Sequence, residues 1–198
     1  MFYDAVKNDH GFPNDPFKAL VAPRPIGWVS TLSADGIANL APYSFFNAVS
    51  EHPHYVVIGS GVGKDSVRNA EASGEFAVNL ATFDLREQMN ASSATVSPDV
   101  DEFVLAGLSK APCRLIAAPR VAESPVCLEC RLFQIVDLPD DHGGIGNRMI
   151  IGRVVGIHID DRFIADGRVN TAAMKPIARL GYSEYATVTE AWRMRRPA

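Results

Sequence analysis

Apolar and polar positions along the chain predict a protein built mainly from β-strands. Residues 26–33 favour a strand, and Asp35-Gly36 is the strongest short signal for a hairpin, so 37–43 is expected to return as the partner strand. The run 54–60 is short and apolar, and 75–81 alternates between apolar and polar residues, so each of them predicts a further strand.

The second half of the chain turns more strongly to strands, at 113–118, 126–138 and 148–160. Gly152 and Gly156 lie inside the last of these, and glycine within a strand indicates a bulge, a barrel bend or a close backbone approach. Many strands, few helices and no repeating strand–helix–strand order indicate an antiparallel barrel with helical excursions.

Helices are predicted at three places. The first covers 66–73, with Asp65 or Ser66 as its N-cap and Gly74 as its stop. The other two are expected at 83–94 and 101–108.

Length and charge narrow the function classes. With 198 residues, 47% of them hydrophobic, the chain is expected to form one domain over 1–198 with its core at about 20–185. A net charge of −4 gives no support to nucleic-acid binding or to docking on anionic membranes. No stretch reaches the ~20 apolar residues of a membrane span, and the polar N-terminus does not match a signal peptide, so a cytoplasmic protein is expected.

The cysteines and histidines give no clear metal or disulfide pattern. Three cysteines without framework spacing fit a reducing compartment. Cys127 and Cys130 form C-x-x-C within a predicted strand, where buried small hydrophobes are the favoured interpretation. His52 and His54 have no nearby third and fourth ligands, so no metal is predicted.

The loop 59–66, GSGVGKDS, resembles a phosphate-binding turn. The nucleoside-triphosphate pattern fails because Asp65 replaces the hydroxyl residue after Lys64, and the dinucleotide pattern fails because Lys64 stands where its third glycine belongs. A single phosphate monoester fits better, held by Lys64, the Ser66 hydroxyl and the free N–H groups of the following helix. The alternative is that Asp65 or Ser66 only caps the helix and Lys64 is solvated.

A second set of polar and aromatic residues precedes this loop. Arg24 lies between two prolines, which stiffen the entry to a strand. Residues 44–50 have no regular period, and adjacent Phe45 and Phe46 cannot both face one side of a strand. This mixture suits a flat aromatic cofactor, with a hydrophobic core plus a loop as the alternative. The polar members of the set are Arg24, Ser30, Thr31, Ser44 and Asn47.

Together these stretches resemble the flavin reductase-like, FMN-binding split-barrel family, in particular its flavoredoxin-type branch. The resembling segments run in family order and cover most of the chain from about 20 to 185. They are 23–31, 39–50, 64–80, 89–94, 101–108, 120–130, 151–161 and 176–185.

The resemblance implies an antiparallel six-stranded split barrel with helical insertions, and a homodimer with FMN at or near the subunit interface. Lys64 and Ser66 would hold the FMN phosphate, with Asp65 capping the helix behind it. Trp28 would contact the cofactor or belong to an interface core. The other implied cofactor-binding residues are Arg24, Ser30, Thr31, Ser44, Phe45, Phe46, Asn47 and Arg179.

Two positions depart from the family pattern. Ser66 stands where the family often has threonine, which keeps the hydroxyl. Tyr182 stands where the family often has a second glycine, and its ring would narrow the approach to the flavin.

The predicted function is an FMN-binding oxidoreductase that uses NAD(P)H to reduce flavin. It would supply reduced flavin to a partner monooxygenase, or act as a flavoredoxin-like electron-transfer protein. A non-enzymatic flavin- or haem-binding module is the alternative. His158 is the candidate catalytic residue, facing the nicotinamide or else lying neutral in the core.

Overall fold

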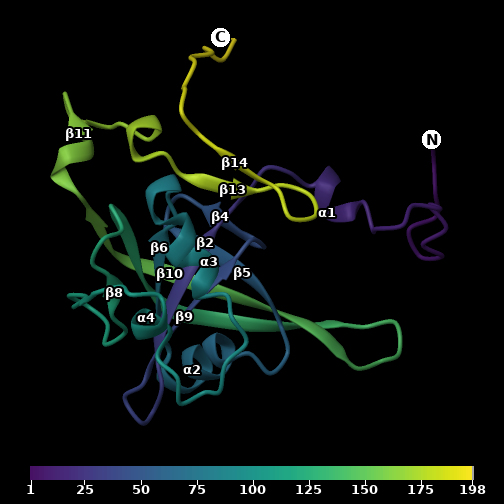
Figure 1. Cartoon of the computed structure of the whole chain (residues 1–198), viewed down its shortest axis with the longest axis horizontal. Helices are drawn as coiled ribbons and strands as arrows, with labels where there is room; N and C mark the ends of the chain where they lie inside the picture. The colour runs from purple at the N-terminus through teal and green to yellow at the C-terminus, as the bar shows by residue number, and fades with distance from the viewer. Residues whose placement is uncertain (198) are drawn as a thin grey trace.

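A seven-stranded antiparallel sheet forms the centre of the computed structural model, which describes residues 1–197 (Figure 1). The strands lie in the order β3-β2-β6-β9-β10-β5-β4, and β3 also contacts β5, so the sheet curls towards a barrel. The predicted antiparallel barrel is therefore found, with seven strands in the sheet where six were expected. The strands are β2 (Gly27–Leu32), β3 (Ala38–Tyr43), β4 (Phe46–Ser50), β5 (Tyr55–Gly61), β6 (Glu75–Leu80), β9 (Val126–Pro139) and β10 (Ile145–Ile159).

Most of the predicted strands are confirmed. β2 and β3 form the expected hairpin, and Gly36 takes the positive φ of 80° that its turn requires. β9 and β10 form the longest hairpin, whose register shifts at Gly152 and again at Gly156. The bulges expected from these glycines are therefore present.

Residues 44–50 are more regular than the sequence indicates. Phe46–Ser50 forms β4, an edge strand that pairs with β5. A register shift between Ala48 and Ser50 interrupts the alternation, which explains the missing period.

The helices are shorter than predicted, except for the first. α2 covers Asp65–Ser73 and ends at Gly74, which has the expected left-handed conformation. The predicted helix at 83–94 divides into a 3₁₀ turn, η1 (Phe83–Leu85), and α3 (Arg86–Ala91). The helix predicted at 101–108 is shorter and forms α4 (Glu102–Leu105). A further short helix, α1, covers Phe17–Leu20. None of the helices in the described part of the chain is long and apolar enough to cross a membrane.

The sheet separates two main apolar clusters. The inner cluster includes Val29, Ile58, Phe76 and Ile150, and α2 closes it with Val67 and Ala70. The outer cluster, centred on Trp28 and Phe103, lies under the segment that carries α3 and α4. Side chains that alternate along β2 therefore belong to the two clusters in turn, Trp28 to the outer one and Val29 to the inner one.

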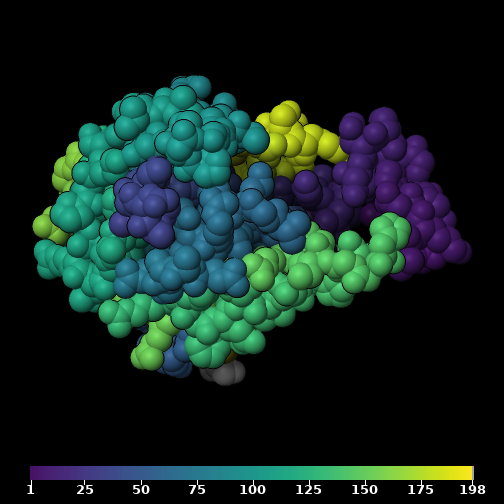
Figure 2. Space-filling view, turned by 90° about the horizontal axis from the view of Figure 1, so that it is seen from below, coloured from purple at the N-terminus to yellow at the C-terminus, as the bar shows by residue number. Residues whose placement is uncertain are grey.

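Short elements complete the chain, and two parts project from the body. The N-terminal segment and the β9–β10 hairpin extend to the same side, to the right in Figures 1 and 2. The short elements are β1 (Arg24–Pro25), β7 (Lys110–Ala111), β8 (Arg120–Val121), η2 (Asp161–Phe163), β11 (Ile164–Ala165), β12 (Arg168–Val169), η3 (Ala172–Met174), β13 (Ile177–Arg179) and β14 (Tyr185–Thr187).

The strand predicted at 113–118 is wrong, because two carboxylates, one of them buried, accept hydrogen bonds from its backbone. The amide N–H groups of Arg114 and Leu115 donate to the Glu129 carboxylate at 2.8 and 2.6 Å, and the Ala117 N–H donates to Glu75 at 2.8 Å. Glu129 itself is 1% exposed. The segment is thus a loop held against β9 by side-chain acceptors.

The inner cluster is packed tightly around Gly152. A Cβ at this position would overlap the ring of Phe76 and lie 3.2 Å from the Cβ of Cys130. Because the Phe76 ring is fully buried, it cannot move aside easily. We expect Gly152→Ala to lower the free energy of unfolding by about 1–3 kcal/mol in a urea titration. Gly61→Ala, where a Cβ meets open space, is the control, and equal stability of the two variants would contradict this packing.

The Glu129 contacts predict a pH dependence of stability. Burial raises the pKa of Glu129, but the Arg114 N–H, His158 and the Leu115 N–H outweigh it and hold the pKa below its ordinary value of 4.5. A carboxyl with a lowered folded-state pKa stabilises the fold above its unfolded pKa, and this contribution is lost as the pH falls through the folded value. We expect the stability difference between the wild type and Glu129→Gln to be constant above about pH 5 and to shrink below it. Exposed Glu184→Gln is the control, and a Glu129→Gln difference independent of pH would refute the assignment.

Candidate functional site

The start of α2 is open to a ligand. Gly63 has a φ of 76°, and Lys64 then occupies the N-cap in an extended conformation without a side-chain cap. The prediction that Asp65 or Ser66 caps this helix is wrong, because both lie inside the first turn. No hydrogen bond to the amide N–H of Asp65 or Ser66 is found within residues 1–197. These two donors and the helix dipole favour an anion at this end.

A cavity of about 330 Å³ lies against this helix start. Lys64 is exposed at its edge, and Arg68 forms an ion pair with Asp65, which neutralises the carboxylate closest to the free amides. Tyr43, Ser93 and Thr95 add hydroxyl groups to the cavity wall. The cavity therefore offers one uncompensated cation, two amides and several hydroxyls.

A buried polar network holds the helix start from behind. The Ser66 hydroxyl donates to Asn39 Oδ1 at 2.7 Å, and Asn39 Nδ2 donates to Glu102 Oε1 at 2.9 Å. Burial raises the pKa of Glu102. The predicted contact of the Ser66 hydroxyl with a phosphate is thus not available while its hydrogen is bonded to Asn39, and the Ser66 N–H is the free donor.

Tyr43 completes the wall next to the network. Ser60 donates to its phenolic oxygen at 3.5 Å, and burial raises the pKa of Tyr43, which keeps the phenol neutral. Sequence reasoning missed Tyr43, Asn39 and Glu102. Tyr43 could have been found because strand alternation from Ala41 places both side chains on one face of β3.

A second cavity of about 270 Å³ adjoins the first, because Pro42 and Ser93 line both. It is lined further by Ser44, Arg24 and Arg179, three residues predicted from the sequence, and by Tyr182. Lys64 therefore lies at one cavity, and Ser44 and Arg179 line the cavity next to it.

The two arginines of the second cavity also hold backbone in place. Arg24 donates to the carbonyl oxygens of Lys18, Val21 and Leu180, and its buried Nε has no partner. Arg179 donates to the Tyr182 carbonyl and the Tyr185 hydroxyl. Both guanidinium groups therefore position the C-terminal segment that walls the cavity.

Three residues predicted to bind the cofactor are buried away from both cavities. Trp28 is fully buried in the outer cluster and donates to the Ser92 hydroxyl at 2.9 Å, so it lies in the core of one chain. Ser30 donates to the Pro119 carbonyl at 2.5 Å. Thr31 accepts from Asn69 at 3.2 Å within the network behind α2. Each side chain is used internally, so within one chain the structure gives no support to a side-chain contact of these three residues with the cofactor.

The two phenylalanines divide as strand geometry requires. Phe46 packs on the inner cluster against Gly27, whereas Phe45 is 44% exposed and its side chain lies over Gly59. Asn47 is exposed, and its side chain accepts from the Ala48 N–H at 2.9 Å. None of these three residues lines the two joined cavities, and their contact with a cofactor stays a prediction.

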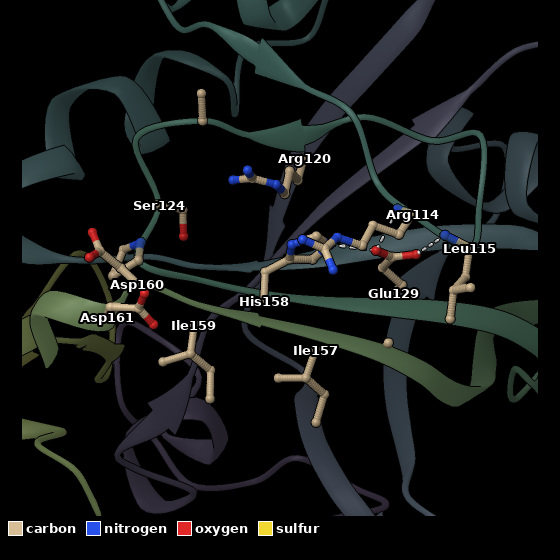
Figure 3. Close-up of a pocket in the computed structure, with 13 residues that line it drawn as sticks. Arg114, Leu115, Arg120, Ser124, Glu129, Ile157, His158, Ile159, Asp160 and Asp161 are labelled. Atoms are coloured by element: carbon tan, nitrogen blue, oxygen red, sulfur yellow. Dashed lines mark hydrogen bonds and ion pairs between the residues drawn. The ribbon is translucent and has the colours of Figure 1, made fainter. Parts of the chain in front are cut away.

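His158 lies in a third cavity, of about 620 Å³, which shares no lining residue with the other two (Figure 3). Its Nε2 is 2.5 Å from Glu129 Oε1, and an ionised carboxylate only accepts, so Nε2 carries a hydrogen. Within one chain this position does not support the predicted catalytic contact of His158 with a flavin-bound nicotinamide.

The same corner contains the only group of three metal-ligating side chains found within the described residues, formed by Cys113, Glu129 and His158. Glu129 already accepts three hydrogen bonds, and Arg114 and Arg120 line the adjoining cavity. Two cations beside the group disfavour a bound metal ion.

The joined cavities suit FMN, the cofactor that the family resemblance implies. Lys64 and the free amides of Asp65 and Ser66 match a phosphate monoester. Pro42, Ile26 and Met89 supply apolar surface in the second cavity for a flat ring, while Ser44 and Asn90 supply polar groups. The residues present therefore fit the group.

Comparisons with known proteins agree with this assignment. A family model described as "Flavin reductase like domain" matches residues 20–173. An uncharacterised protein from Aquifex aeolicus is 38% identical over 172 residues, which cover 84% of this chain and 85% of that protein.

Solved structures show the same fold. Nitrilotriacetate monooxygenase component B from Bacillus cereus superposes with a TM-score of 0.89 at 28% identity, covering 98% of each chain. A flavin reductase with a split-barrel domain from Shewanella frigidimarina gives a TM-score of 0.86 at 20% identity, covering 100% of each chain. This protein has the split-barrel fold and belongs to the flavin reductase-like domain family.

Proposed function

We propose that this protein binds FMN and catalyses the reduction of flavin by NAD(P)H. The observation that carries the proposal is the open start of α2, where Lys64 and two free amides face a cavity that shares Pro42 and Ser93 with a second one. A ligand with a phosphate at one end and a flat ring at the other fits these two cavities. Family membership supports flavin-related redox chemistry.

The chain's own residues hold and orient the cofactor in this proposal. Lys64 and the Asp65 and Ser66 amides bind the phosphate, and Arg68 keeps Asp65 from repelling it. Bound FMN would supply the redox chemistry, which is transfer of hydride and of electrons. Arg179 and Tyr182 form the wall beside the ring and limit what approaches it.

A homodimer is part of the proposal. An apolar groove of about 490 Å³, lined by residues that include Val49, Leu128 and Ile157, lies on the surface. Val49 and Ile157 are 58% and 52% exposed, which is unusual for neighbouring apolar side chains of a monomer. A second copy of the chain is the partner that we propose for this surface, while FMN near a subunit interface stays a prediction.

We further propose a cytoplasmic protein of one domain that delivers reduced flavin to a partner oxygenase. The likeness to a monooxygenase component B supports this role over that of a flavoredoxin-like electron carrier. The three free cysteines fit a reducing compartment.

The phosphate contact is tested by comparing two ligands. We expect Lys64→Ala to weaken FMN binding roughly tenfold to a hundredfold, the equivalent of a charged hydrogen bond of about 1.5–3 kcal/mol. Riboflavin lacks the phosphate, so its affinity should hardly change. Fluorescence titration of the apoprotein measures both, and Lys7→Ala, at an exposed position in the N-terminal segment, is the control. Equal losses for the two flavins would place the phosphate elsewhere.

The reaction is tested by anaerobic titration of the FMN-loaded protein with NADH and with NADPH. We expect the flavin absorbance near 450 nm to bleach with at least one of them, because hydride transfer reduces the ring. Stoichiometric FMN binding without bleaching by either nucleotide would instead support the non-enzymatic flavin-binding module. Failure to bind FMN at all would reject both.

A further inference from the structure

The third cavity has the features of a binding site that the proposed flavin reaction does not use. It lies between the loop that follows β7 and the end of β10, and its volume is about 620 Å³. Figure 3 shows Arg114, Arg120 and His158 lying around this space, with Glu129 at one end and Asp160 and Asp161 at the other.

The end of the cavity that contains Glu129 is rigid and its negative charge is already balanced. Glu129 accepts from the Arg114 and Leu115 amides and from His158 Nε2. A buried carboxylate that accepts three hydrogen bonds does not require a cation from a ligand. His158 Nδ1 takes part in none of the hydrogen bonds found within residues 1–197.

The two arginines, by contrast, have no acceptors of their own. No side-chain hydrogen bond or ion pair of Arg114 or Arg120 is found in the part of the chain that the structure describes. The Nε of Arg120 is buried without a partner, although a buried donor without an acceptor is unfavourable. Two guanidinium groups without acceptors favour the binding of an anion at this site.

The acidic residues at the other end do not supply that anion. Asp160 is occupied, because it pairs with the Arg162 guanidinium at 2.5 Å and accepts the Arg162 N–H at 3.0 Å. Asp161 forms part of η2 and lies with Asp160, at the end away from Glu129 (Figure 3). The positive charge of the arginines is therefore available to a ligand.

We propose that this cavity binds a small molecule through a phosphate or carboxylate group held between Arg114 and Arg120. Both guanidinium groups present planar pairs of N–H donors that match the oxygens of such a group. His158 Nδ1 provides a further polar contact beside them. The proposal does not depend on flavin binding, because the cavity shares no lining residue with the flavin cleft.

Calorimetric titration of the FMN-saturated protein at low salt tests this site, with inorganic phosphate in one arm and malonate in the other. We expect saturable binding of at least one anion, weakened at least tenfold in Arg120→Gln and partly retained in Arg120→Lys. Arg153→Gln, which changes an exposed arginine of β10, is the matched control and should bind as the wild type does. Thermal melts confirm that each variant is folded.

Two results would overturn the proposal. One is the absence of saturable binding of either anion by the folded wild type. The other is binding that Arg120→Gln leaves intact while Lys64→Ala removes it, because the anion would then occupy the α2 start. Phosphate binding alone or malonate binding alone identifies which of the two groups the ligand carries.

Discussion

The hydrogen bonds of Asn39 fix the geometry of the proposed flavin cleft, which consists of the cavity at the start of α2 and the cavity that shares Pro42 and Ser93 with it. Its amide joins three elements, since it accepts from Ser66 at the start of α2, donates to Glu102 of α4 and belongs to β3. Asn39 is 8% exposed, so these bonds form in a low-dielectric setting, where a broken one leaves an unsatisfied group. These bonds therefore fix the position of the start of α2 relative to β3, the strand that ends at Tyr43.

This network also explains how acidic residues can surround an anion-binding turn. Asp65 is paired with Arg68, and the Glu102 carboxyl is turned towards Asn39 and the Leu40 amide. Burial raises the pKa of Glu102, which lowers its tendency to carry a full charge. Lys64 and the two free amides then lie beside carboxylates that are paired or hydrogen-bonded, although the whole chain has a net charge of −4.

Local signals in the sequence were sufficient for the elements that depend on local chemistry. Some features follow from the intrinsic backbone preferences of single residue types. They are the hairpin at Asp35-Gly36, the end of α2 at Gly74 and the bulges at Gly152 and Gly156. The prediction that Lys64 binds a phosphate likewise rests on its place after a glycine-rich turn. The cleft around it required knowledge of which distant segments pack together.

The differences from the sequence-based expectations share one cause. The tertiary fold decides which hydrogen-bond partner a polar side chain has. Ser30 and Thr31 have the hydroxyls that a cofactor site needs, but they donate to or accept from internal partners. The loop at 113–118 has the apolar pattern of a strand, yet Glu129 and Glu75 take its amides. Burial of a carboxylate is not visible in a single sequence, so neither result could be read from it.

Tyr182 shows where the structure accepts strain at the flavin cleft. Its φ of 54° is left-handed, a conformation that disfavours a bulky side chain by about 1 kcal/mol or more. Arg179 donates to its carbonyl oxygen, and Arg24 donates to that of Leu180 two residues earlier, so two guanidinium groups hold the turn in place. Glycine would adopt this turn freely. The structure thus places a strained tyrosine, 55% exposed, in the wall of this cavity, and strained backbone residues cluster at ligand-binding sites.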